Sequence, residues 1–128
     1  MLGSVAELRP HEKAYLDHAR IVEIGCRLGA SAADDFMSQA MEEIAVLLGE
    51  AERAYEAGQL VRLRAAAAQI AGHAAAIGMA SLERAAGSLV DVTRRNSPGA
   101  ALAAVCHRMI RAGEQSLMAF WELGDVSL

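Results

Sequence analysis

The sequence predicts an all-α fold, an antiparallel four-helix bundle preceded by a short lead helix. Apolar residues recur at steps of three and four along four long segments, which is the spacing of a helix face that packs on a core. Hydrophobic residues make up 54% of the chain and aromatic residues only 4%, because alanine supplies much of the hydrophobic total. This composition favours closely packed helices over strands. The connections between the segments are short, which favours helices that alternate in direction.

The chain of 128 residues is expected to form one domain, spanning residues 1–128, because this length allows a core without metal or disulfide support. Residues 1–12 have no clear period and are predicted to form a loose N-terminal segment. Residues 124–128 are predicted to be a frayed tail. The lead helix is predicted within residues 13–29, where the glycines at 25 and 29 would end it.

Two helices are predicted after the lead helix. The first would begin at Ser31, whose hydroxyl can cap it, with Asp34–Asp35 in the first turn, where negative charge favours the helix dipole. It is expected to end at Gly58. The second would run from about Gln59 to Ile77, and Gly78 is expected to terminate it as a C-cap.

The last two helices carry apolar stripes over residues 82–92 and 102–120, separated by the sequence RRNSPG. Ser97 followed by Pro98 has the pattern of a cap and a first helical position. The matched spacing in the four long helices predicts a shared core. The residues expected to be buried in it are Ile44, Leu63, Ile70, Ile77, Leu89 and Met109.

Composition and charge argue against several classes of function. The net charge of −4 disfavours a general nucleic-acid role. No run of about 18 uncharged apolar residues is present, so no membrane span is expected. The N-terminus lacks a basic start followed by an apolar signal core, so the protein is expected to be cytoplasmic. Cys26 and Cys106 are isolated in sequence, so free thiols are expected, with a disulfide or a reactive thiol as the alternatives.

Three stretches carry a family resemblance. The first is LDHARIVEIGCRLG and the second is the segment 34–89. The third, AQIAGHAAAIG at 68–78, lies within the second. Their layout resembles the histidine-containing phosphotransfer (Hpt) domain of bacterial phosphorelays, from about Leu16 to Leu123, with the first stretch as the lead helix. The family pattern on the third helix runs roughly His, two residues, Lys-Gly, then small residues ending in Leu-Gly. The chain fits if Gly72 takes the glycine and Ile77–Gly78 takes the Leu-Gly.

This register places Ala68 where the family has its phosphorylated histidine and Ala71 where it has a lysine. An alanine methyl group cannot accept a phosphoryl group, and no cation at position 71 would balance the charge of a phosphate. The resemblance therefore implies the family's scaffold, but not phosphotransfer at these positions. Whether the chain is an enzyme stays open, with the expectation that it is not.

His73 is the alternative phosphoacceptor on the third helix. At about 100° per residue it lies about 140° from Ala68, beside the core stripe that contains Ile70. The expected role of His73 is a boundary histidine hydrogen-bonded to a neighbouring helix, with phosphate acceptance or a partner contact as alternatives. His107 is a second candidate. The pair Cys106–His107 supplies too few ligands for zinc, so no metal and no cofactor are expected.

Small residues dominate the face of the third helix centred on Ala68. In the Hpt family this surface docks the receiver domain of a response regulator or a histidine-kinase domain, so the resemblance implies such a partner here. The alternative is an ordinary solvent face whose alanines are only good helix formers. The candidate partner-binding residues are Arg64, Ala65, Ala68, Ala71, Gly72 and Ala75.

Three functions are therefore open. The first is a degenerate Hpt module that docks a receiver or kinase domain without accepting phosphate. The second is an active phosphotransfer protein that uses His73. The third is a self-associating bundle, such as a homodimer, that shares only the scaffold. The alanine at position 68 distinguishes the first function from the second. Whether the face around Ala68 is open in the monomer distinguishes the first function from the third.

Overall fold

The computed structural model describes residues 16–95 and 99–126, with side chains through Leu123. These residues form no strand and five helices: α3 (His18–Leu28), α4 (Ala30–Glu56), α5 (Leu60–Ile77), α6 (Ala80–Arg94) and α7 (Gly99–Val126). The all-α prediction is confirmed. The predicted loose segment at 1–12 and the predicted Ser97–Pro98 cap lie outside the described residues.

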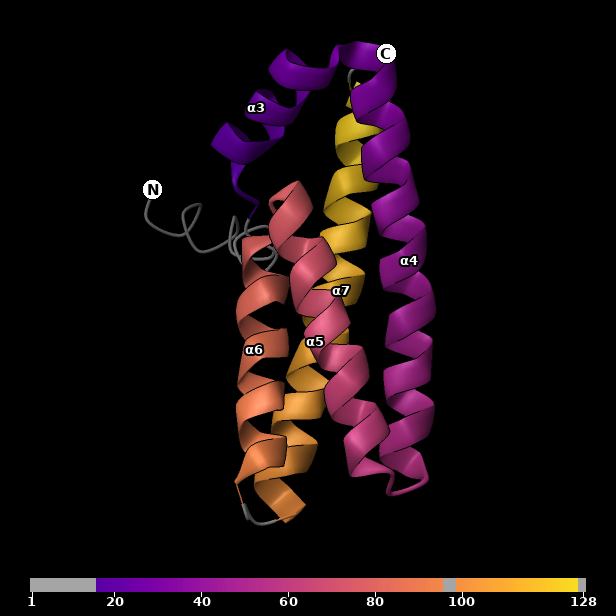
Figure 1. The fold of residues 1–128 in the computed structure, drawn as a ribbon, viewed down its shortest axis with the longest axis vertical. Coiled ribbons are helices and arrows are strands. Elements are labelled where there is room, and N and C mark those ends of the chain that lie inside the picture. The colour runs from indigo at the N-terminus through magenta and orange to yellow at the C-terminus, as the bar shows by residue number, and fades with distance from the viewer. Residues whose placement is uncertain (1–15, 96–98, 127–128) are drawn as a thin grey trace, which may run out of the picture.

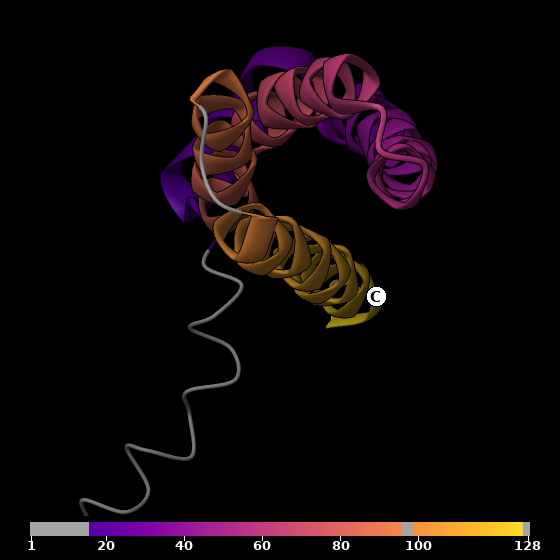
Figure 2. The same cartoon turned by 90° about the horizontal axis from the view of Figure 1, so that it is seen from below.

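The helices pack as a bundle. α4 packs along α5, α5 along α6 and α6 along α7, whereas α7 meets α4 over a smaller contact. Figure 1 shows α4 to α7 side by side, with α3 across one end, where it packs on α4 and α5. In the end view of Figure 2, α4, α5 and α6 follow one another around an arc, and α7 lies next to α6. α5 is therefore flanked by α4 and α6, which leaves its outer side uncovered by the described helices.

The core lies between the four long helices. All six residues predicted to be buried, Ile44, Leu63, Ile70, Ile77, Leu89 and Met109, have 0% exposure. Alanines at 51, 67, 74 and 86 are equally buried among them. Small side chains at these positions let neighbouring helix axes approach closely, since axial separation depends on the side chains at the contact.

Gly29 decides where α4 begins. Its φ of 84° is a conformation that glycine adopts readily, its N–H donates to the carbonyl of Gly25 at 2.9 Å, and its carbonyl accepts from the N–H of Ala33 at 2.9 Å. One residue thus ends α3 and starts α4. The prediction that Ser31 caps α4 is wrong, because Ser31 lies inside the helix and Asp34–Asp35 lie beyond its first turn.

The start of α3 is fixed to the C-terminal end of α5. Asp17 caps α3 by accepting from the backbone N–H of Arg20 at 3.1 Å, and its own N–H donates to the carbonyl of Gly78 at 2.7 Å. Nε of Arg20 donates to the carbonyl of Ala76 at 3.3 Å. Gly78 adopts the predicted left-handed C-cap conformation, with φ 81°. Carbonyls that α5 leaves without a helical partner are therefore bonded by the segment that begins α3.

Three features of the helices differ from the sequence prediction. Phe36 and Leu60 fall at the three-and-four apolar spacing that predicts a buried face, yet they are 41% and 43% exposed. α4 has 27 residues against 18 in α5, so the N-terminal part of α4 that carries Phe36 has no α5 residue beside it, and Leu60 is the first residue of α5. α7 continues past Gly124 to Val126, because one glycine costs a helix only about 1 kcal/mol. Across residues 16–95 and 99–126, no helix is long and apolar enough to cross a bilayer.

Candidate functional site

α5 has two faces of opposite character. Its inner stripe, which includes Ile70, Ala74 and Ile77, is fully buried. Its outer stripe recurs at steps of four and three residues and is exposed along its whole length. We refer to this stripe as the α5 face; it consists of Val61, Ala65, Ala68, Gly72 and Ala75. Because only one of these side chains is larger than a methyl group, a partner can approach the backbone of α5 closely.

The structure brings the predicted partner-binding residues together on one side of α5. Four of them, Ala65, Ala68, Gly72 and Ala75, are exposed and belong to the α5 face. Ala71 and Arg64 are half-buried and lie at the edge that turns toward α6. Sequence periodicity thus located the α5 face, but it did not distinguish the exposed residues of that face from the half-buried residues at its edge.

Arg64 is bonded to α6. Its Nε donates to Oγ1 of Thr93 at 3.1 Å, and its Nη2 donates to the carbonyl of Thr93 at 3.0 Å. Oγ1 of Thr93 in turn donates to the carbonyl of Val90 at 2.7 Å. Thr93 lies in the last turn of α6, where carbonyls lack helical partners and positive charge is favourable. Arg64 therefore fixes the end of α6 against α5, a role that its sequence neighbourhood did not indicate.

Gly72 lies near the centre of the α5 face and has no structural reason to be glycine. A Cβ added there would meet no atom within 4 Å, and its φ is not positive. The same holds for Gly87 on α6. A glycine inside a helix costs about 1 kcal/mol relative to alanine, so these two positions lower stability without an internal gain. Two features fix how α5 is aligned along α6: the turn after Ile77 and the bonds from Arg64 to Thr93. In this alignment Gly87 lies near the level of Ala71.

His73 lies apart from the α5 face. It is half-buried and stands about 140° around the helix from Ala68, as the sequence predicts. The expected hydrogen bond from His73 to a neighbouring helix is not present among the described residues. His107 is exposed on α7, away from α5. No described histidine therefore takes the position that Ala68 occupies.

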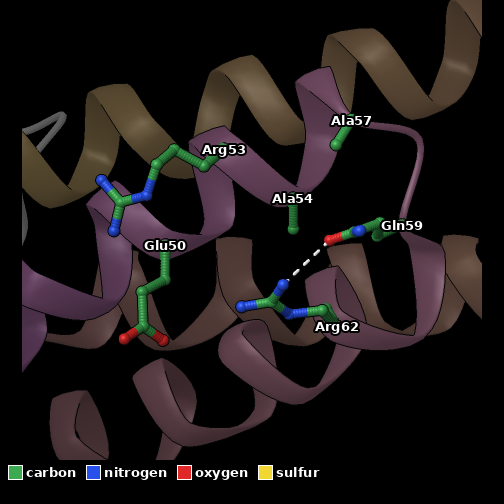
Figure 3. Close-up of a pocket in the computed structure, with 6 residues that line it drawn as sticks. All are labelled: Glu50, Arg53, Ala54, Ala57, Gln59 and Arg62. Carbon is green, nitrogen blue, oxygen red and sulfur yellow. Dashed lines mark hydrogen bonds between the residues drawn. The ribbon is translucent and has the colours of Figure 1, made fainter.

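A solvent-open pocket lies where α4 ends and α5 begins (Figure 3). Glu50 and Arg53 come from α4, and Gln59 and Arg62 come from the connection and the start of α5. Nη1 of Arg62 donates to Oε1 of Gln59 at 3.1 Å. The pocket carries charges of both signs, its remaining lining residues are Ala54 and Ala57, and none of its lining side chains is a Ser, Cys or His nucleophile.

The cysteines do not add chemistry to the α5 face. Cys106 is buried on α7, and burial, with a smaller effect from the negative charge of Glu52, raises the pKa of its thiol. Cys26 is exposed on α3. No three His, Cys, Asp or Glu side chains converge as a metal site within the part of the chain that the structure describes. The described cysteines therefore lie outside the α5 face.

No protein-family model, no curated protein and no solved structure matches the chain. The likeness to the Hpt family accordingly remains a resemblance in helix layout and in the spacing of Ala68, Gly72 and Gly78.

Proposed function

We propose that this chain is a degenerate Hpt domain, a phosphorelay-type module that docks a response-regulator receiver domain or a histidine-kinase domain without accepting phosphate. In this proposal α4 to α7 form the antiparallel four-helix bundle of that family, α3 is its lead helix, and the cytoplasm is its location. The consecutive packing from α4 to α7 supports this arrangement, as does the length of α3, 11 residues.

The exposure of Ala68 is the observation that carries the proposal. Ala68 aligns with the family's phosphohistidine, and it lies uncovered in the α5 face between Ala65 and Gly72. A partner that approaches this position meets methyl groups and bare backbone instead of an imidazole. Shape complementarity can therefore extend across the position where the family performs its chemistry.

The same residues remove the phosphotransfer step. Transfer to histidine requires a ring nitrogen whose lone pair attacks phosphorus, and the methyl group of Ala68 has no lone pair. Ala71 supplies no cation to balance the charge of a phosphate. Arg64, at the edge of the face, uses two of its donor groups on Thr93. A docked receiver would thus keep its phosphate, so the chain would act as an adaptor or as a competitor of an intact phosphotransfer protein.

Titration against the receiver domains and kinase domains of the native cell tests the docking. At least one domain is expected to bind saturably, with a Kd on the order of micromolar, as suits a transient signalling contact. Receiver domains are tested both phosphorylated and unphosphorylated. An absence of binding to every such domain would contradict the proposal.

Phosphate labelling tests the missing chemistry. Incubation with an active sensor kinase and labelled ATP is expected to leave no acid-labile phosphate on the chain, because Ala68 and Ala71 replace the reactive histidine and its lysine. An intact Hpt domain in the same reaction is the positive control. A stable label that disappears in His73→Gln would instead favour an active phosphotransfer protein that uses His73.

A further inference from the structure

Charge is distributed unevenly over the helices. Between residues 84 and 111 the sequence has five arginines and one acidic residue, Asp91. α4, residues 30–56, has seven acidic residues and one basic residue, Arg53. Positive charge is thus concentrated in the segment 84–111 and negative charge on α4, although α6 also carries Glu83 and α7 also carries Glu114, Glu122 and Asp125 outside that segment. Figure 2 shows α4 and α6 on different sides of the bundle.

Two of these arginines lie on the side of α6 that is turned away from α5. Thr93 marks the side that faces α5, because it binds Arg64. Arg84 lies about 180° around the helix from Thr93, and Asp91 lies about 160° from it. Nε of Arg95 donates to the carbonyl of Asp91 at 3.4 Å, which holds this guanidinium on the same side.

Two more arginines lie on the side of α7 that is turned away from α4. Gly113 marks the side that faces α4, because Leu48 lies directly over it. Arg108 and Arg111 lie about 140° and 160° around the helix from Gly113. Together with His107 they border a shallow depression floored by the small residues Ala103 and Ala104.

Since α6 packs along α7, these four arginines share one outer surface of the bundle, which we call the basic surface: Arg84, Arg95, Arg108 and Arg111. All four are exposed, and none makes an ion pair with another described residue. Elsewhere the chain does pair its arginines, since Arg20 and Arg27 both lie within 4 Å of Glu23, at 2.9 and 3.9 Å. The positive charge of the basic surface is therefore available to an external partner.

α4 carries the complement of the basic surface. Its acidic face, defined as Asp35, Glu42, Glu43 and Glu50, is exposed, and none of these carboxylates makes an ion pair with a described residue; one cation, the exposed Arg53, lies on the same side of the helix. Val46 lies among them and is 59% exposed. An apolar centre bordered by negative charge thus faces outward on α4, and a small-residue centre bordered by positive charge faces outward on α6 and α7.

We propose that the basic surface of one copy binds the acidic face of α4 on a second copy. Val46 would lie over Ala103 and Ala104, and the carboxylates would meet the arginines around them. Because the two surfaces differ and lie on different sides of the molecule, each copy can bind one neighbour through each surface, so the assembly is head-to-tail and open-ended. A polyanion is a poorer fit, since no Phe, Tyr or Trp for base stacking lies between residues 84 and 111 and Asp91 interrupts the arginines.

Sedimentation velocity of the full chain at about 20 mM and about 500 mM NaCl tests this assembly, because exposed ion pairs weaken as the Debye length shortens. At low salt the average mass is expected to rise with concentration beyond that of a dimer, with a Kd on the order of 0.1 mM, since each exposed pair contributes little. High salt is expected to return the chain to the monomer. A monomer at low salt, or an association that salt strengthens, would overturn the proposal.

Charge reversal identifies the surfaces. Arg108→Glu with Arg111→Glu is expected to weaken self-association about tenfold or more, and Glu42→Lys with Glu43→Lys likewise, because each turns attraction into repulsion. Mixing the two double variants is expected to restore pairing between them. Arg27→Glu on α3 makes the same charge change as Arg108→Glu alone, lies outside the residues that define both surfaces, and is expected to leave association intact. Equal loss in this control, or no rescue on mixing, would refute the assigned surfaces.

Discussion

Gly78 joins the end of α5 to the start of α3. Its φ is 81°, and a Cβ there would lie 2.9 Å from the carbonyl oxygen of Asp17 and 3.4 Å from Arg20. Gly78→Ala is expected to lower the free energy of unfolding by about 1–3 kcal/mol, from the left-handed backbone and from this contact. Chemical denaturation measures the loss.

Gly58 is the matched control for Gly78. Its φ is 72°, but a Cβ there would meet no atom within 4 Å. Gly58→Ala therefore carries the conformational cost without the contact, and is expected to be the milder change. If the two variants lost equal stability, the close approach of the Asp17 carbonyl oxygen to Gly78 would be contradicted.

Cys106 and Cys26 are expected to differ in reactivity. Cys106 is 4% exposed and its pKa is raised, so a thiol reagent should modify Cys26 in the native chain and reach Cys106 only on unfolding. Because folding favours the protonated thiol, this contribution to stability is intact below the ordinary thiol pKa and is lost as the pH rises through the raised one. Counting reactive thiols with and without denaturant checks this; two fast-reacting thiols in the native chain would contradict it.

Single residues show what sequence periodicity can predict. The burial of Ile44 and Met109 follows from spacing alone, because apolar residues at helical steps must share a face. The bonding of Arg64 to Thr93 could not be predicted in this way, since the partners are 29 residues apart and meet only when α6 packs on α5. The same holds for the bond from Asp17 to Gly78.

Gly113 of α7 lies directly against Leu48 of α4. A Cβ at Gly113 would lie 2.5 Å from Cδ1 and 2.9 Å from Cδ2 of Leu48, which is itself buried. Gly113→Ala is therefore expected to be net destabilising, because overpacking costs about 1–3 kcal/mol and exceeds the gain in helix propensity. Gly72→Ala gains the same propensity in open space and is expected to stabilise the chain by about 0.5–1 kcal/mol.

Thermal and urea unfolding of the two glycine variants separate packing from propensity. The predicted order of stability is Gly72→Ala above the unsubstituted chain and Gly113→Ala below it. Gly113→Ala combined with Leu48→Ala is expected to remove the overpacking, although it opens space of its own. Equal stabilisation by both single variants would mean that α7 is not held against α4 at Leu48.

Helix ends were predicted less well than helix cores. Ser31 has the chemistry of an N-cap, but Gly29 reverses the chain two residues earlier and leaves Ser31 inside α4. Gly78 was predicted correctly because a left-handed C-cap favours glycine locally. The start of α4 depends on where α3 ends, so local propensity could not predict it. The C-cap at Gly78 depends on one left-handed backbone conformation, so local propensity could predict it.

At the scale of the whole molecule, the α5 face and the basic surface occupy different sides. Thr93 faces α5, and the arginines of the basic surface lie on the side of α6 opposite to it. Self-association through α4 and the basic surface would therefore leave the α5 face open on every copy. A row of copies would present several such faces, which raises the effective affinity for a partner that carries more than one docking domain.

The position of Ala68 and Ala75 opposite the core stripe of Ile70 and Ile77 was predicted from the sequence, whereas the openness of the face was left undecided there. The burial of Ala74 between these faces follows from the same geometry. The identity of a partner was not predictable, because alanine and glycine carry little chemical information. Docking at this face is the central claim, and a substitution that changes only the outer surface tests it.

The most direct measurement is the affinity of Ala75→Arg for a receiver or kinase domain that binds the unsubstituted chain, with Ala74→Arg as the control. Ala75 is exposed, so the variant should keep its stability within about 0.5 kcal/mol yet lose binding, because a bulky charge at a close-packed contact costs several kcal/mol. Ala74 is 0% exposed, so Ala74→Arg should instead lower the melting temperature. A well-folded Ala75→Arg protein that binds its partner with unchanged affinity would contradict docking through the α5 face.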